Sequence, residues 1–174
     1  MTCLLALAAA IAVNTSANPF VTPAIANHGK VVRLPDAAEQ PRDGAKIVVD
    51  LTAGGSREKL NAAVEKVARY VNIYAGAGRK PATVRITVVL HGEATAVALS
   101  DAAYGKRFKT RGNPNLPLIR KLKKAGVEFF VCGQALAHMK FAPAEVAGEL
   151  PIAVSALTVN VNRQQQEYAY VPLH

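Results

Sequence analysis

Short apolar runs recur along the chain and predict the strands of a sheet. They are rich in β-branched residues and bounded by Gly, Pro or polar residues, which is typical of buried strands. The clearest runs are residues 46–51 (KIVVDL), 83–90 (TVRITVVL), 127–131 (VEFFV) and 168–173 (YAYVPL). Residues 151–154 are a weaker candidate. Pro172 suits an edge strand, because proline cannot donate a hydrogen bond to a neighbouring strand.

Apolar residues at helical spacing lie between these runs. From Leu60 to Tyr74 they recur every three or four positions and predict one face of an amphipathic helix. Ser56 is its expected N-cap, and Gly76 and Gly78 are expected to end it. This stripe is the clearest helical signal in the chain.

Further helices are predicted over residues 94–104 and around residues 118–125, where Gly126 is the candidate C-cap. Residues 157–161 alternate between apolar and polar, which taken alone favours a strand. Runs that alternate with helical patterns indicate right-handed βαβ units and a parallel sheet covered on both faces. The sequence therefore predicts an α/β fold, with no internal repeat and no second domain.

The first 29 residues contain no Lys, Arg, Asp or Glu. Residues 4–13 (LLALAAAIAV) are all apolar but fall short of the roughly 20 residues that a membrane-spanning helix needs. Together with the small residues Ala24 and Ala26, they predict a secretory signal peptide over residues 1–26. The alternatives are an apolar disordered leader and a buried first helix. We expect a periplasmic or secreted protein with no stable membrane anchor, an irregular arm at 27–45 and one domain at 46–174.

The composition of the chain limits the chemical classes of ligand and partner that it is expected to bind. The formal charge is +9, which favours anionic ligands, yet aromatic residues make up only 6% and Trp is absent, which argues against a nucleic-acid surface built on base stacking. The two cysteines rule out a disulfide framework. If the leader carrying Cys3 is removed, Cys132 is the only thiol.

Cys132 is the candidate catalytic residue. It follows a predicted strand directly, and a thiol at the start of a helix is activated because free backbone N–H groups stabilise its thiolate. A lone thiol also suits a persulfide, since no second cysteine can expel the sulfur as a disulfide. The alternative is a buried cysteine that packs as a small apolar residue.

Other residues at strand ends are candidate ligand-binding groups. They are His91, Gly92, Gly133, Gln134 and His138. His91 could orient a ligand or act as a base, although a structural role is the alternative for each histidine. The spacing of Cys132, His91 and His138 matches no zinc signature, so neither a metal nor another cofactor is expected.

Positive charge is concentrated in residues 106–124, which hold eight of the 21 Lys and Arg residues and no acid. We expect Lys106, Arg107, Lys109 and Arg111 to attract small anions or an acidic partner. A solvated helix face and loop are the alternative.

Several short motifs together resemble the DsrE/DsrF-like family. They are residues 88–92 (VVLHG), 113–115 (NPN), 125–127 (AGV), 131–134 (VCGQ) and 164–170 (QQQEYAY), within a match over 46–173. The resemblance implies a three-layer α/β/α domain around a mainly parallel sheet of about five strands, assembled as a homotrimer or hexamer. It also implies a helix over residues 155–166, and we prefer that helix to the strand because a parallel sheet needs a crossover before Tyr168.

In sulfur-relay members of that family, a cysteine at the position matching Cys132 accepts a persulfide and passes it on. The resemblance therefore implies a protein that binds or relays sulfane sulfur, with a donor or acceptor protein or a small anionic sulfur species as partner. The well-understood sulfur-relay members are cytoplasmic, whereas the predicted signal peptide makes this chain an exported protein. The alternative is a non-catalytic oligomeric binding module with a basic docking surface.

Overall fold

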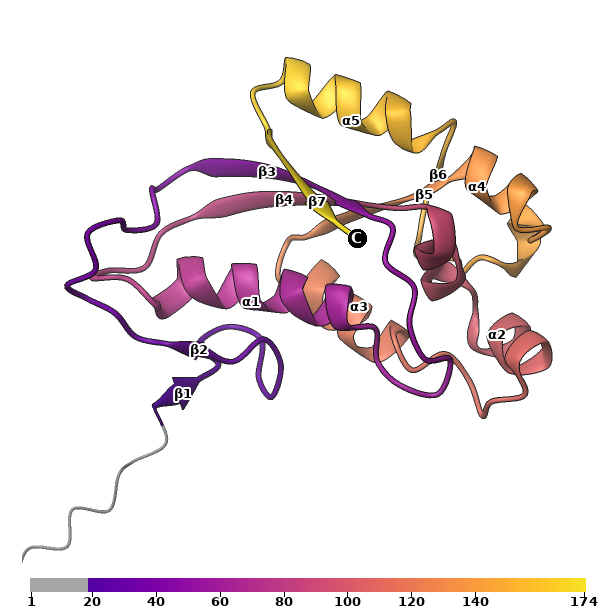
Figure 1. The fold of residues 1–174 in the computed structure, drawn as a ribbon, viewed down its shortest axis with the longest axis horizontal. Coiled ribbons are helices and arrows are strands. Elements are labelled where there is room, and N and C mark those ends of the chain that lie inside the picture. Colours follow the sequence, from indigo (N-terminus) through magenta and orange to yellow (C-terminus); the bar gives the residue numbers. More distant parts are fainter. Residues whose placement is uncertain (1–18) are drawn as a thin grey trace, which may run out of the picture.

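A computed structural model describes residues 19–174 and contains a parallel sheet of five strands in the order β6-β5-β4-β3-β7 (Figure 1). Its strands are β3 (Ala45–Leu51), β4 (Val84–Leu90), β5 (Glu128–Cys132), β6 (Ile152–Ala153) and β7 (Ala169–Leu173). All four neighbouring pairs are parallel. The strands predicted from apolar runs are therefore confirmed, and β7 with Pro172 lies at an edge as expected.

Helices cover both faces of the sheet, which makes the predicted three-layer α/β/α arrangement (Figure 1). On one face lie α1 (Ala62–Gly76) and α3 (Leu116–Lys124), and on the other lies α5 (Ala156–Gln165). Four short helices lie in the connections beyond the carboxyl ends of β4 and β5. After β4 come η1 (Gly92–Ala98) and α2 (Asp101–Phe108), and between β5 and β6 come α4 (Gly133–His138) and η2 (Pro143–Glu145). The crossover helix before β7 is thus the one that the family resemblance implied.

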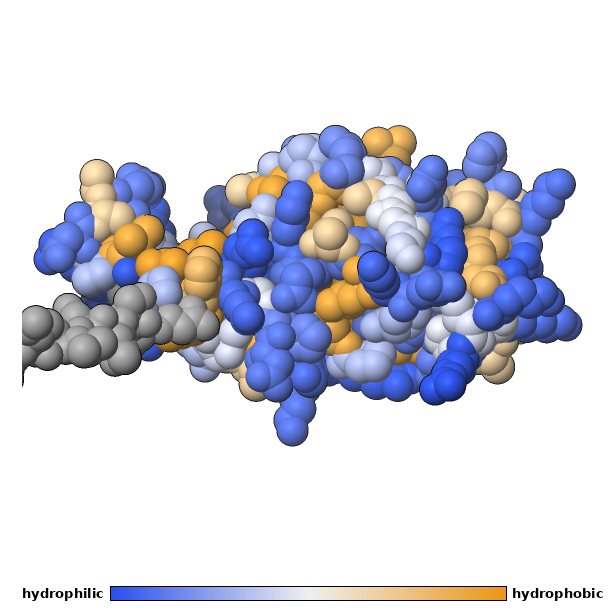
Figure 2. Space-filling model, turned by 60° about the horizontal axis from the view of Figure 1, so that its bottom comes forward, coloured by the Kyte–Doolittle hydropathy of each residue, from blue (hydrophilic) through white to orange (hydrophobic). Residues whose placement is uncertain are grey.

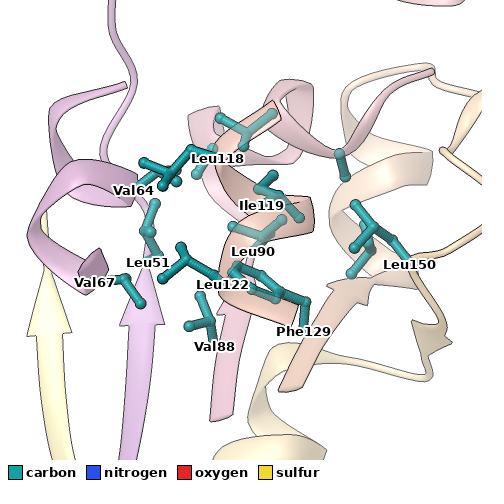
Figure 3. Packing of buried hydrophobic residues seen from close by; sticks show 14 of the residues in the cluster. Leu51, Val64, Val67, Val88, Leu90, Leu118, Ile119, Leu122, Phe129 and Leu150 are labelled. Carbon is teal, nitrogen blue, oxygen red and sulfur yellow. The ribbon is translucent and has the colours of Figure 1, made fainter. Parts of the chain in front are cut away.

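The main core lies between the sheet and the α1–α3 layer. Leu51, Leu90 and Phe129 from the strands meet Val64 of α1 and Leu122 of α3, all of them buried (Figure 3). These side chains alternate along the strands with residues of the opposite face, as the period of two in a strand requires. Burial of this apolar surface is the largest stabilising contribution to the fold.

The face under α5 is packed much more thinly. Its buried apolar cluster consists of Val89, Cys132, Ala156 and Val159. The same side of the sheet carries polar groups, which are described below. Alternate residues of β3, β4 and β5 therefore face two different environments, one fully apolar and one mixed.

Residues 20–32 form a small antiparallel hairpin of β1 (Phe20–Val21) and β2 (Val31–Val32) against α1. Asn72, fully buried on α1, holds this segment: its Oδ1 accepts from the N–H groups of Ala24 and Ile25 at 2.9 and 2.8 Å. Its Nδ2 donates to two carbonyl oxygens, those of residues 28 and 29. The segment expected to be irregular thus contains a short strand that is fixed to the domain.

Most of the predicted signal peptide, residues 1–18, lies outside the described residues. Its last part is described, and Ile25 is buried in the core at 3% exposure. Cleavage after Ala26 would remove β1 and Ile25 from the domain, and this boundary stays a prediction.

Two local predictions were wrong. Helix α1 begins at Ala62 with Asn61 as its N-cap, whose side chain accepts from the N–H of Ala63 at 2.8 Å, so Ser56 is not the cap. The helix predicted over 94–104 is divided into η1 and α2. Ser100 interrupts it, because its hydroxyl accepts from the N–H of Ala103 and starts α2 instead.

No helix among residues 19–174 has the length and apolar character that crossing a bilayer requires. The surface over α1 and α3 is largely hydrophilic, with scattered hydrophobic patches (Figure 2). Hydrophilic side chains project strongly at the right-hand end of this view, which is the α2 side of the molecule in Figure 1.

Candidate functional site

Two of the predicted site residues, His91 and Cys132, lie side by side at the carboxyl edge of the sheet. Leu90 of β4 and Val131 of β5 are registered partners; His91 follows directly after β4, and Cys132 is the last residue of β5. Both have extended backbone conformations, so the alternation of the strands continues through them. Ligand sites of open parallel sheets form at this edge, where the helices diverge.

His91 is held by a carboxylate that the sequence analysis did not identify. Its Nε2 lies 2.6 Å from Oδ1 of Asp50, a buried residue of β3. An ionised carboxylate only accepts hydrogen bonds, so the Nε2 atom carries the proton and donates it. The lone pair of the neutral ring is therefore on Nδ1, for which no partner exists among residues 19–174. This arrangement orients His91 as a proton acceptor through Nδ1.

Tyr170 of the edge strand β7 completes the group. Its hydroxyl donates to Oδ2 of Asp50 at 2.5 Å, so each carboxylate oxygen has a donor. Burial raises the pKa of Asp50, but the hydrogen bonds from His91 and Tyr170 outweigh it and lower that pKa to about 2. The same hydrogen bond, which neutral Tyr170 donates, raises the pKa of Tyr170 to about 12. At neutral pH Asp50 is therefore a carboxylate and Tyr170 a protonated phenol, and both are joined to the ring of His91 by this network.

Asn160 brings α5 into this polar centre. Its side chain helps to lower the pKa of Asp50. The residue is only 8% exposed, and its Oδ1 has no hydrogen-bond partner among the residues described. An acceptor buried without a donor is costly, of the order of 1–3 kcal/mol. The face under α5 thus contains a buried acceptor that lacks a donor, and no such atom is found on the α1–α3 face within residues 19–174.

Cys132 is the only free cysteine that the structure describes, and it is 5% exposed. Its Sγ accepts a hydrogen bond from the N–H of Ala135 at 3.4 Å and so caps α4, as expected for a thiol at the start of a helix. Its other surroundings are apolar, with Val89, Ala156 and Val159 in the same cluster. The thiol thus combines a polar contact on one side with aliphatic packing on the other.

The predicted neighbours of Cys132 hold the backbone around it. A Cβ on Gly133 would lie 3.0 Å from the carbonyl oxygen of Ala153, so a side chain there would push β6 away. Gln134 donates from Nε2 to the carbonyl oxygen of Val154 at 3.3 Å. These two residues fix the connection between β6 and α5, which lies beside the thiol.

Gly92 and His138 are placed differently. Gly92 has a φ of 53°, which favours glycine, and allows the turn from His91 into η1. His138 is exposed in the last turn of α4, about 9 Å along the helix axis from its start. The structure therefore places His91 and Cys132 at the carboxyl ends of two neighbouring strands and leaves His138 at the opposite end of α4.

The four predicted anion-binding residues fall into two groups. Arg107 is engaged internally, because its guanidinium donates from Nε and Nη2 to the two carboxylate oxygens of Glu145, both at 2.6 Å. This pairing lowers the pKa of Glu145 to about 2. Lys109 and Arg111 instead line an open cavity beyond the end of α2. Lys106 is exposed on α2.

Within residues 19–174, no three His, Cys, Asp or Glu side chains gather in a way that could hold a metal ion. The carboxyl edge carries a thiol, an imidazole and a buried carboxylate, from Cys132, His91 and Asp50. Asp50 and Tyr170 were missed in the sequence, although an acid inside the apolar run KIVVDL is a detectable signal of a buried polar role.

The fold and this edge define an α/β protein with one cysteine at the end of a central parallel strand. The chain belongs to the DsrE/DsrF-like family, whose model matches residues 46–173. Its fold is similar to that of a solved protein of unknown function, MTH1491 from Methanobacterium thermoautotrophicum, with a TM-score of 0.55 and 17% identity over 74% of this chain and 99% of that chain. A comparison with curated proteins gives no match.

Proposed function

We propose that this protein binds or relays sulfane sulfur as a persulfide on Cys132. The observation that carries the proposal is the place of Cys132 in a DsrE/DsrF-like domain: it ends a central strand and caps α4 with its sulfur. Family membership supports a role related to sulfur relay. Because fold transfers between relatives better than function, the persulfide itself needs a direct test.

The transfer is a thiol–disulfide type of exchange. The Cys132 thiolate attacks the outer sulfur of a donor persulfide, a new S–S bond forms at Sγ, and the donor S–S bond breaks. The donor leaves as a thiolate, or as sulfite when the donor is thiosulfate, so no external oxidant or reductant is needed. An acceptor thiolate then attacks the outer sulfur, and Cys132 leaves as a thiolate.

His91 is the residue that we propose accepts the proton of the Cys132 thiol. Its free Nδ1 and its position next to Cys132 support this role, and Asp50 orients it by holding Nε2. An imidazole that accepts the thiol proton increases the fraction of thiolate, which is the reactive form. Asp50 and Tyr170 are positioning residues in this proposal.

The burial of Cys132 limits the size of the sulfur donor that can reach its thiol. With 5% of the residue exposed, the thiol offers little room for a bulky donor unless the connection between β6 and α5 moves. A small anionic sulfur species, such as thiosulfate or a polysulfide, therefore suits the site better than a rigid protein surface. The expected donor or acceptor protein would need that movement.

The test is mass spectrometry of the folded protein after exposure to thiosulfate or polysulfide, in a Cys3→Ser background so that Cys132 is the only thiol. We expect a gain of one sulfur atom on Cys132, formed at least about tenfold more slowly in His91→Ala. His138→Ala is the matched control and should react as the parent does. A thiol that reacts only in denaturant would contradict the proposal.

The second candidate is a non-catalytic oligomeric binding module. The observation that favours it is the combination of a buried thiol with exposed apolar residues on the α5 side: Ile152, Val154, Leu157, Val161 and Tyr170. Such a patch suits a second copy of the chain, in line with the expected trimer or hexamer. The basic segment would then dock an anionic ligand or an acidic partner.

Sedimentation of the folded protein tests this second candidate. We expect an oligomer that Leu157→Glu converts to a monomer, whereas Leu34→Glu, at an exposed apolar position in the N-terminal arm, should not. An oligomer with an inert Cys132 would support the binding module over the carrier. A monomeric parent protein would exclude the module as proposed.

We also propose that the protein acts in the periplasm or outside the cell. The support is the apolar leader sequence at residues 4–13 and the small residues Ala24 and Ala26. Expression in a secreting host followed by N-terminal sequencing tests this. A product that keeps Met1 and stays inside the cell would contradict it.

A further inference from the structure

A cavity of about 520 Å³ lies at the carboxyl side of the sheet, between the end of α2 and the segment that follows β3. Three cations from two separate segments line it: Arg57 on one wall, and Lys109 and Arg111 on the other. Its volume falls in the range of small-molecule sites, about 300–1,000 Å³. The sulfur chemistry proposed above does not use it.

None of these three cations is in an ion pair within residues 19–174. No carboxylate lies within 4.0 Å of any of them among residues 19–174, whereas the nearby Arg107 and Arg120 are paired with Glu145 and Glu149. Glu58 and Asp101 also line the cavity, so its walls carry one net positive charge. Asp101 already has a cationic partner, since its Oδ2 lies 3.9 Å from Nη2 of Arg120, and its Oδ1 accepts from the N–H of Asn113. The unpaired charge in the cavity is thus mainly positive.

The loop that carries Lys109 and Arg111 is fixed before any ligand arrives. Lys109 ends α2 with a φ of 60°, and the loop folds back so closely that a Cβ on Gly105 would lie 2.9 Å from the carbonyl oxygen of Thr110. Asn113, 3% exposed, anchors its far end by donating to the carbonyl oxygens of two residues of the η1 segment, 97 and 99. A fixed loop loses little entropy on binding.

Backbone donors are available beside these side chains. The N–H groups of Arg111 and Gly112 have no hydrogen-bond partner in the part of the chain that the structure describes. On the opposite wall, the guanidinium of Arg57 lies 4.7 Å from the centre of the Phe108 ring, which holds it in place. Fixed N–H groups and guanidinium groups together are the usual donors for phosphate-like oxyanions.

We propose that this cavity binds a small molecule through a tetrahedral oxyanion, either a phosphate or a sulfur oxyanion. Arg57, Lys109 and Arg111 supply the charge, and the unpaired N–H groups of Arg111 and Gly112 supply further donors. The cavity is larger than a bare oxyanion, so the group belongs to a larger molecule. Glu58 opposes the charge of the ligand.

The test is calorimetric titration of the folded protein with inorganic phosphate, sulfate and thiosulfate at constant ionic strength. We expect saturable binding that Arg111→Gln weakens about three- to tenfold, since one charge-assisted contact is lost. Glu58→Gln should strengthen binding about two- to threefold, because it removes the opposing charge. Tighter binding of phosphate or of thiosulfate identifies which oxyanion the site selects.

Arg42→Gln is the matched control, because Arg42 is 87% exposed in the N-terminal arm, far from the cavity in sequence and absent from its lining. It should bind as the parent does. Equal weakening by Arg42→Gln and Arg111→Gln would show diffuse attraction to net charge and overturn the proposal, as would the absence of saturable binding. Cys132→Ser should leave binding unchanged, which separates this site from the proposed sulfur carrier.

Discussion

The two faces of the sheet are built from the same strands and differ in almost every physical respect. Phe129 and Phe130 are neighbours on β5: Phe129 is 2% exposed in the main core, whereas Phe130 is only partly buried, beneath Arg163. The α1–α3 face is apolar throughout, while the α5 face holds Asp50, His91 and Cys132. The comparison suggests that one face stabilises the domain and the other is free to carry polar chemistry.

The sharpest test of this comparison is the matched pair Phe129→Ala and Phe130→Ala. We expect Phe129→Ala to lower the free energy of unfolding by about 3–5 kcal/mol, because it leaves a cavity in a closed core. Phe130→Ala should cost about 1–2 kcal/mol, since part of that ring already contacts water. Urea unfolding measures both. Equal losses would mean that the two faces contribute alike to stability.

The N-terminal hairpin packs on the outer side of α1, and its contribution to the stability of the domain can be tested in the same way. A chain that starts at Asn27 should be about 2–4 kcal/mol less stable than one that starts at Pro19, because it loses Ile25 from the core and leaves Oδ1 of Asn72 without its two donors. Thermal and urea unfolding of the two chains measure this. If their midpoints coincide, the hairpin is not part of the stable domain.

Asp50→Asn tests the polar face. The pKa of Asp50 is lowered to about 2, so its charged form stabilises the folded state above about pH 4, and this contribution is lost as the pH falls through about 2. The shift from 3.8 corresponds to about 2 kcal/mol. We expect Asp50→Asn to be less stable by about that amount at pH 7.

Unfolding measured between pH 7 and pH 2 provides the control for this effect. The stability difference between the parent and Asp50→Asn should stay constant down to about pH 4 and shrink below it. Asp36→Asn, at an exposed position in the N-terminal arm, should behave as the parent throughout. A difference that does not depend on pH would assign the loss to altered packing and not to charge.

Tyr170→Phe is expected to have the smallest effect, about 1 kcal/mol, because one hydrogen bond at a half-exposed position is removed. In the parent protein the pKa of Tyr170 is raised to about 12. The stability that its hydrogen bond to Asp50 contributes is therefore present below about pH 10 and is lost as the pH rises through about 12. Ultraviolet titration of the parent should show one tyrosine that ionises late and is missing in Tyr170→Phe. If all tyrosines ionise together, Tyr170 does not donate to Asp50.

The sequence predicted the layer order because its strongest signals come from the main core. The stripe from Leu60 to Tyr74 and the runs at residues 46–51 and 83–90 are continuous where burial is complete. Helix α5 was harder to recognise, since it buries Val159 but leaves Leu157 and Val161 exposed, so its apolar residues do not mark its inner side. The helix there was indicated by the family resemblance and by the need for a crossover before Tyr168, and not by the apolar pattern of the segment.

The candidate site was predicted in part for a related reason. His91 and Cys132 stand at strand ends, where a local pattern is enough to place them. The partnership of Asp50 with Tyr170 depends on β7 pairing with β3, and these residues are 120 positions apart in the chain. No local pattern records which strands become neighbours, so this contact is visible only in three dimensions.

The pairing of β3 with β7 has a consequence for biosynthesis. Among the sheet strands β3 leaves the ribosome first and β7 last, yet Val49 and Val171 must become registered partners. Until residues 169–173 have emerged, one edge of β3 is unpaired and Asp50 lacks the phenol that donates to it. The nascent domain therefore reaches its native state only after translation of its last strand, and until then the open edge of β3 is exposed to wrong pairing.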